Sequence, residues 1–160
     1  SYPLMKRLTY WPQLFLGITF NYGIILGWTS ISEEINLIII LFYIGAIFWT
    51  LGYDTIYGYQ DIKDDEIIGL KSTSIKFKNS AKQFLFLCYT ILSVLFLVGG
   101  YYMNFKYIYF AIFIVPLIHL FFFQIKKFNK NNPSDCLKIF KSNNMFGLII
   151  FLNILIAKNL

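Results

Sequence analysis

Charged residues, histidine and cysteine are scarce in this chain. Only 14% of its 160 residues are charged, one is histidine and two are cysteine, whereas a soluble domain has about 25% charged residues. The two cysteines, Cys88 and Cys136, form neither a CxxC pair nor a zinc-ligand spacing. They therefore predict no disulfide framework and no zinc centre, and we interpret them as ordinary residues.

Apolar and aromatic residues, in contrast, are abundant. Hydrophobic residues make up 58% of the chain and aromatic residues 21%. A soluble protein of this length has too little interior to bury so much apolar surface. Lipid must therefore be the solvent for most of the chain. This excludes an ordinary soluble domain and makes the lipid bilayer a partner of the protein.

Five apolar runs follow one another along the sequence. A spanning helix needs about 20 largely apolar residues. Four runs approach this length, while a fifth, over residues 145–157, does so only when it is extended upstream. The expected spans are residues 10–28, 35–57, 84–103, 107–123 and 140–157. The sequence thus predicts an all-α fold, a polytopic membrane helix bundle with five transmembrane helices.

Three features inside these spans have structural interpretations. Pro116 should kink or loosen the fourth span, which membrane helices tolerate when neighbours satisfy the freed carbonyl group. Gly23 and Gly27 form a GxxxG pattern in the first span, which is typical of a close helix–helix contact. His119, the only histidine, is interpreted as a packed or interhelical hydrogen-bonding residue, with a catalytic base as the alternative.

The basic residues predict how the chain is oriented in the membrane. Twelve of the 14 Lys and Arg residues precede the first span, or lie between the second and third or the fourth and fifth. Because cytoplasmic loops carry the excess of Lys and Arg, we expect a cytoplasmic or matrix N-terminus and a C-terminus on the opposite side. A bacterial and a mitochondrial inner membrane both remain open. The net charge of +6 then needs no nucleic-acid partner.

Most of the negative charge lies in one short stretch. Five of the eight acidic residues fall within 13 positions: Asp54, Asp61, Asp64, Asp65 and Glu66. If the helix of the second span continues through Gly58, a rotation of about 100° per residue places Asp61 and Asp65 within about 20° of Asp54. Asp61 and Asp65 are also i,i+4 neighbours, with Cβ atoms about 5–6 Å apart.

This acidic stretch has more than one interpretation. Like charges at such spacing repel, so a cation should compensate them, and oxygen ligands without nearby His or Cys suit Mg²⁺. The alternative is a solvated loop balanced by Lys63 and Lys71. The position of Asp54 beside an apolar span favours a functional site. A transporter that binds a divalent cation at its mouth is a further alternative, although spans one, three and five contain almost no polar residues to form a path.

Three stretches of the chain, in order, resemble the UbiA superfamily of intramembrane aromatic prenyltransferases. The stretch YDTIYGYQDIKDDEIIGLKSTSI, residues 53–75, is similar to the second aspartate-rich motif of that family. Residues 2–28, YPLMKRLTYWPQLFLGITFNYGIILGW, are similar to the segment that begins the second half of its members. Residues 136–152, CLKIFKSNNMFGLIIFL, resemble the final helix and the loop before it. The likeness is greatest to the 4-hydroxybenzoate polyprenyltransferases of ubiquinone biosynthesis.

The resemblance implies a bundle of nine spanning helices, of which residues 1–160 would supply the last five as the C-terminal part of one prenyltransferase membrane domain. Its substrates would be a polyprenyl diphosphate and 4-hydroxybenzoate, with Mg²⁺ as the cofactor. By position, the metal ligands would be Asp61 and Asp65, supported by Asp54. Lys6 matches the lysine of the YxxxK pattern and would be catalytic together with Asp61 and Asp65. The expected diphosphate-binding residues are Tyr2, Lys6, Arg7 and Lys71.

The resemblance also raises an expectation about what is missing. The first motif of the family, NDxxDxxxD, does not occur in these 160 residues, which begin with Ser1. We therefore expect a fragment that is inactive alone and whose partner is the missing N-terminal half of the same protein. Other acceptors of the family, such as homogentisate, a naphthoate or haem, remain alternatives.

Overall fold

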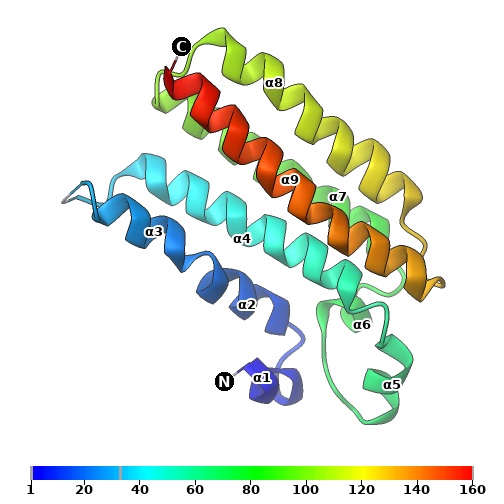
Figure 1. Ribbon diagram of the computed structural model, residues 1–160. Helices are drawn as coiled ribbons and strands as arrows, with labels where there is room; N and C mark the ends of the chain where they lie inside the picture. Colours follow the sequence, from blue (N-terminus) through cyan, green and yellow to red (C-terminus); the bar gives the residue numbers. More distant parts are fainter. Residues whose placement is uncertain (1, 33, 160) are drawn as a thin grey trace.

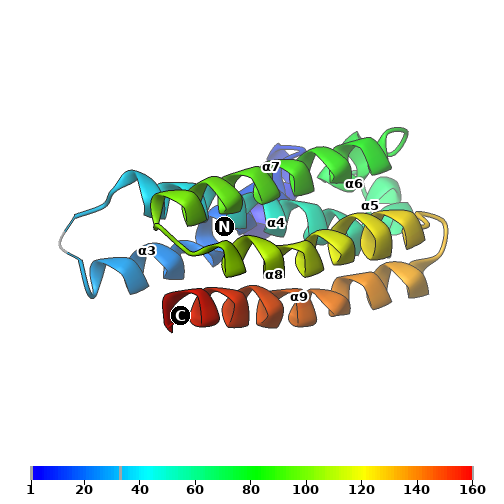
Figure 2. The same ribbon diagram turned by 90° about the horizontal axis from the view of Figure 1, so that it is seen from above.

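The chain folds into helices arranged as one bundle, as predicted (Figure 1). The computed structural model describes residues 2–32 and 34–159, and this part contains no strand. The helices are α1 (Tyr2–Leu8), α2 (Pro12–Phe20), α3 (Tyr22–Thr29), α4 (Leu37–Tyr57), α5 (Ile62–Ile67), α6 (Thr73–Lys76), α7 (Ala81–Tyr102), α8 (Tyr107–Ile118), the π-helix η1 (His119–Ile125) and α9 (Pro133–Asn159). The long helices run roughly alongside one another, as a second view also shows (Figure 2).

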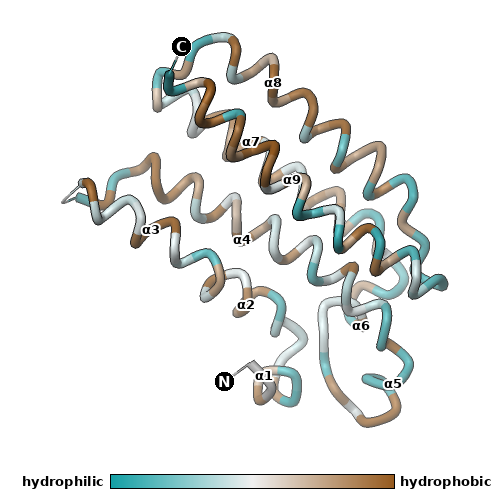
Figure 3. The backbone as a smooth tube through the Cα atoms, in the orientation of Figure 1, coloured by the Kyte–Doolittle hydropathy of each residue, from teal (hydrophilic) through white to brown (hydrophobic). Residues whose placement is uncertain are grey.

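Four helical segments are long and apolar enough to cross a membrane. They are α4, α7, the continuous run α8–η1 over residues 107–125, and α9. They coincide with the second to fifth predicted spans. The last begins earlier than expected, because Pro133 starts α9 at a position that needs no N–H donor. Hydrophobic residues dominate these helices (Figure 3). The chain is a multi-pass membrane protein on this basis.

The first predicted span, residues 10–28, is not one helix, so the expected count of five is only approximate. It divides at Asn21 into α2 and α3. The buried side-chain amide of Asn21 donates to Gly17 O (2.8 Å), Ala46 O (3.3 Å) and Thr50 Oγ1 (2.8 Å). Irregular backbone is tolerated at membrane depth where protein groups satisfy it, and α4 supplies two of these three partners.

Pro116 precedes a change of helix type. Because proline lacks an N–H donor, the regular ladder of α8 is interrupted there, and the chain continues from His119 as seven residues of π-helix. Within this segment the fully buried Gln124 accepts from Tyr89 Oη (2.5 Å) and donates to Asn143 Oδ1 (3.0 Å). His119 stacks on Phe123, with ring centroids 5.3 Å apart, which fits the packed interpretation.

The centre of the bundle is the contact between α4 and α7. Leu51 and Ile56 of α4 and Leu85, Tyr89 and Leu92 of α7 are almost completely buried there. Cys88 and Cys136 are free and buried, as expected of ordinary residues.

The GxxxG pattern does not make the close contact we predicted. A Cβ atom added to Gly23 or Gly27 would meet nothing within 4 Å, so neither glycine packs against another helix in the part of the chain that is described. The close approach occurs instead at Gly52, where an added Cβ would lie 2.5 Å from Cε1 of Tyr89. The sequence pattern alone could not distinguish Gly52 from Gly23 and Gly27, because all three glycines lie in apolar helices.

Replacing Gly52 by alanine should therefore destabilise the protein, whereas Gly23→Ala should not. The Tyr89 ring cannot move aside without a loss of stability, because it is fully buried and its hydroxyl group is hydrogen-bonded to Gln124. Overpacking of this kind costs about 1–3 kcal/mol, while alanine in an open helical position gains up to about 1 kcal/mol of helix propensity. Thermal midpoints of the purified variants in detergent measure the difference. Equal midpoints for both variants would contradict this packing.

Candidate active site

A small polar pocket lies at the C-terminal end of α4, where α1, α2 and α5 come together. Its volume is about 210 Å³. The residues that line it are Lys6, Gln13, Leu16, Asp54, Tyr57, Gly58, Asp61 and Asp65. Three carboxyl groups and one ammonium group therefore share one site. This end of the bundle, which holds α1, α5, α6 and the starts of α7 and α9, also carries twelve of the 14 basic residues. We call it the lysine-rich end.

The three aspartates reach the pocket by a route that differs from the predicted one. Helix α4 ends at Tyr57 rather than continuing through Gly58, and α5 begins at Ile62 with Asp61 as its N-cap. The expected single helical face from Asp54 to Asp65 is therefore wrong. A turn over residues 58–61 brings α5 back beside the end of α4. The i,i+4 spacing of Asp61 and Asp65 survives as the first turn of α5, where Asp65 N donates to Asp61 O (2.9 Å).

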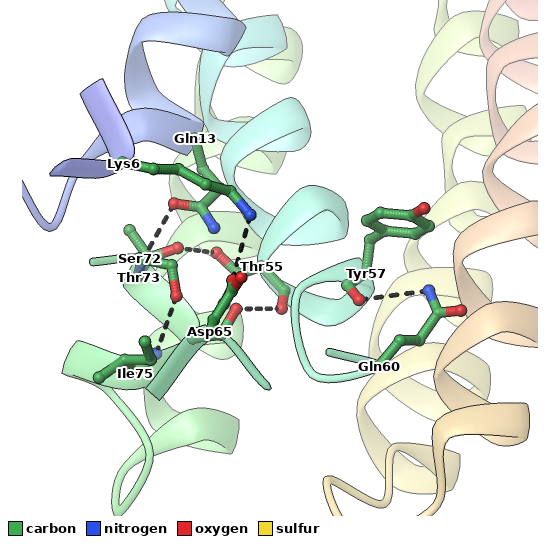
Figure 4. A network of polar contacts seen from close by, with 10 residues as sticks. Lys6, Gln13, Thr55, Tyr57, Gln60, Asp65, Ser72, Thr73 and Ile75 are labelled. Atoms are coloured by element: carbon green, nitrogen blue, oxygen red, sulfur yellow. Dashed lines mark hydrogen bonds and ion pairs between the residues drawn. The ribbon is translucent and has the colours of Figure 1, made fainter. Parts of the chain in front are cut away.

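Lys6 supplies the positive charge in the pocket. Its Nζ atom lies 3.1 Å from Oδ2 of Asp65 (Figure 4). Asp65 is only 7% exposed, so it needs a partner of opposite charge or a cation. Lys6 is itself held in place by its backbone, because Lys71 N donates to Lys6 O (2.7 Å). Asp54 is also buried, whereas Asp61 is exposed toward solvent.

A second network fixes the wall of the pocket. Gln13 Oε1 accepts from Thr73 N (3.0 Å), and the hydroxyl groups of Thr73 and Thr55 are 2.6 Å apart (Figure 4). Ser74 Oγ donates to Thr55 O (2.8 Å). These bonds hold α6 against α2 and α4. Gln13 is almost completely buried, and it was not predicted from the sequence as a site residue. The signal that could have found it is a polar residue at the start of an apolar run.

Two other predicted site residues, Arg7 and Lys71, do not line the pocket. Arg7 is exposed and does not line it. The Lys71 ammonium group points elsewhere, 3.5 Å from Leu8 O and 5.7 Å from the centre of the Tyr10 ring. The side chain of Tyr2 lies outside the described part of the structure. Lys71 instead helps to position Lys6, because its backbone N–H donates to Lys6 O.

The remaining acidic residues and His119 lie outside the pocket. Asp64 is exposed and lines a neighbouring hollow, and Glu66 pairs with Lys78 Nζ at 2.7 Å. His119 belongs to η1, well inside a candidate span. Asp61 and Asp65, the predicted i,i+4 neighbours, thus line the pocket, whereas Asp64 and Glu66 do not.

The donor chemistry of the pocket fits a hard cation that also binds an external ligand. Its potential metal ligands are carboxylate and amide oxygens, which Mg²⁺ prefers. Among residues 2–32 and 34–159, however, no group of three or more Asp, Glu, His or Cys side chains lies close enough to form a complete metal site. Mg²⁺ is often held by one or two carboxylates and completed by waters and substrate phosphates, and the pocket suits that arrangement.

Comparison with known proteins gives a consistent result over nearly the whole chain. The model of the UbiA prenyltransferase family matches residues 1–154. Three mitochondrial 4-hydroxybenzoate polyprenyltransferases are similar to this chain, those of Bos taurus, Drosophila melanogaster and Arabidopsis thaliana. They are 45%, 43% and 39% identical to the chain, over 98%, 98% and 99% of its length. The chain spans only 42%, 40% and 39% of the lengths of these relatives. No solved structure matches significantly. The family match and these identities show that the chain belongs to the UbiA prenyltransferase family.

Proposed function

We propose that this chain supplies the second aspartate-rich half of an active site that transfers a polyprenyl group from polyprenyl diphosphate to 4-hydroxybenzoate, in ubiquinone biosynthesis. The observation that carries the proposal is the pocket in which Lys6, Asp54, Asp61 and Asp65 meet at the end of α4. The names of the relatives support the acceptor and the polyprenyl donor.

The residues of the pocket have separate tasks in this proposal. Asp61 and Asp65 would hold Mg²⁺, which neutralises charge on the departing diphosphate when it is bound. Without substrate, Lys6 neutralises the buried Asp65. When the diphosphate arrives, Lys6 exchanges this carboxylate for a phosphate oxygen and so stabilises the charge that develops there. Asp54 supports the site from the end of α4, and Gln13 and the backbone of Lys71 keep α1 and α6 in place.

In this reaction the protein forms no covalent bond with either substrate. The bond between C1 of the prenyl group and the diphosphate oxygen breaks, and the electron pair leaves with the diphosphate. The ring carbon ortho to the phenol group forms a bond to C1, and its proton passes to the released diphosphate, which restores the aromatic ring. What the site must provide is charge stabilisation away from water.

The chain on its own provides one set of carboxylates. We assign the others to a first aspartate-rich motif, NDxxDxxxD, in a part of the same protein outside residues 1–160. The greater length of the relatives supports this assignment. We also place the lysine-rich end on the matrix side of a mitochondrial inner membrane, because Lys and Arg accumulate on that side and the relatives' names describe them as mitochondrial.

Removal of divalent metal tests both the reaction and the cofactor. The full-length protein in lipid should prenylate 4-hydroxybenzoate, lose this activity in EDTA and regain it when Mg²⁺ is added in excess. Mass spectrometry of the product measures the transfer, with homogentisate as the competing acceptor. Full activity in EDTA would refute the metal assignment, and a preference for homogentisate would refute the acceptor. Cation flux in liposomes without any prenyl transfer would refute the proposed enzymatic function and favour a transporter.

A further inference from the structure

A second, strongly basic hollow lies at the lysine-rich end, away from the aspartate pocket. It has a volume of about 590 Å³ and shares no lining residue with that pocket. Five lysines line it, and no acidic residue does: Lys78, Lys82, Lys126, Lys127 and Lys130. The hollow lies between the start of α7 and the loop that connects η1 to α9. Lys130 ties this loop to the segment just before α7 by donating to Lys78 O (2.9 Å).

Most of this positive charge is not neutralised by the protein. Lys78 pairs with Glu66. The other four lysines form no ion pair with a carboxylate in the described residues 2–32 and 34–159. All five lysines of the hollow are exposed. Such a concentration of like charge favours an anionic ligand from outside.

The hollow is placed where two candidate spans leave the hydrocarbon region. Lys82 lies in the first turn of α7, and Lys126 and Lys127 directly follow η1. Both α7 and residues 107–125 are long and apolar enough to cross the membrane. The lysines therefore lie at the depth of lipid headgroups.

An apolar surface continues from the hollow toward the membrane interior. Phe86, which is i+4 from Lys82 and therefore on the same face of α7, is 55% exposed, and its neighbour Leu87 is 54% exposed. On η1, Phe122 is 67% exposed. The rings of Phe86 and Phe121 are 5.3 Å apart, so the two helices form one apolar surface. The Lys127 ammonium group lies 4.5 Å above the ring of Phe123, at the border of charge and aromatic surface.

We propose that this hollow binds the phosphate headgroup of an anionic phospholipid, whose acyl chains lie along Phe86, Leu87 and Phe122. Basic pockets between spanning helices on the matrix or cytoplasmic side suit such headgroups. A free phosphate would use the lysines but not the exposed apolar surface beside them. Lysine is a flexible point charge rather than a planar fork, which suits a mobile headgroup.

Lipid selectivity of the full-length protein tests this site. The protein is reconstituted in phosphatidylcholine that contains a minor fraction of spin-labelled phosphatidylglycerol or cardiolipin, and the motionally restricted lipid is measured by electron paramagnetic resonance. The triple variant Lys82→Gln, Lys126→Gln, Lys127→Gln should lower the preference for anionic over zwitterionic lipid at least about fivefold. The matched variant Lys63→Gln, Lys138→Gln, Lys141→Gln removes the same charge from the same end and should stay within about twofold of the unchanged protein.

Three results would overturn the proposal. Equal loss in both triple variants would mean that bulk surface charge attracts the lipid. No loss in the first variant, with an unchanged thermal midpoint, would mean that the hollow is not the site. Displacement of the labelled lipid by millimolar inorganic phosphate would identify a site for free phosphate. A separate variant, Phe122→Ser, should weaken binding while it leaves all five lysines in place.

Discussion

Replacing Asp65 by asparagine in the full-length protein is expected to lower the rate of prenyl transfer about a hundredfold or more. Asparagine keeps the shape of the side chain but removes the negative charge that we assign to Mg²⁺. Asp65 is buried and lines the pocket, and its Oδ2 atom accepts a hydrogen bond from Lys6 Nζ at 3.1 Å. Initial rates at saturating substrate and several Mg²⁺ concentrations measure the effect, and the Mg²⁺ concentration for half-maximal rate should rise.

The neighbouring residue provides a matched control. Asp64→Asn removes the same charge one position away, from an exposed side chain that lines a different hollow. Its rate should stay within about threefold of the unchanged protein, as surface substitutions usually have small effects. Thermal midpoints show whether either variant is unfolded. If Asp65→Asn folds and turns over as fast as Asp64→Asn, the carboxylate has a structural task only.

The spans could be predicted from sequence because apolar length is a property of local composition. Helices α4, α7, α8–η1 and α9 follow directly from runs of Ile, Leu and Phe. The division at Asn21 could not be predicted in this way. It depends on Ala46 and Thr50, which lie 25 and 29 residues away. The same is true of the close approach at Gly52, which requires knowledge of which face of α7 carries Tyr89.

The site was predictable in its residue types and less so in its geometry. The spacing of acidic residues separated Asp54, Asp61 and Asp65 from Asp64 and Glu66, and the pocket contains the first three. The assumed continuous helix through Gly58 was wrong, because α4 ends at Tyr57 and a turn over residues 58–61 leads into α5. No spacing rule could place Lys6 beside Asp65, since 59 residues separate them. The family resemblance assigned Lys6 and Asp65 to one active site, but only the structure shows that they form an ion pair.

Removing the charge of Lys6 should produce the second large effect. Lys6→Gln is expected to raise the KM for polyprenyl diphosphate and to lower kcat/KM about 30- to 100-fold, because the diphosphate loses a direct positive contact. Arg7→Gln is the matched control, since Arg7 is adjacent but exposed and outside the pocket. Its kcat/KM should change less than about threefold. Lys6→Arg keeps the charge and should recover part of the loss.

The double variant Lys6→Gln, Asp65→Asn separates a catalytic pair from a structural one. Lys6→Gln leaves the buried Asp65 carboxylate without its ammonium partner, which costs stability. The second substitution removes that unpaired charge, so the thermal midpoint of the double variant should return toward that of the unchanged protein. Prenyl transfer should nevertheless remain as low as in Asp65→Asn, because both the metal ligand and the diphosphate contact are absent. Recovery of transfer together with stability would show that the ion pair between Lys6 and Asp65 serves the fold and not the reaction.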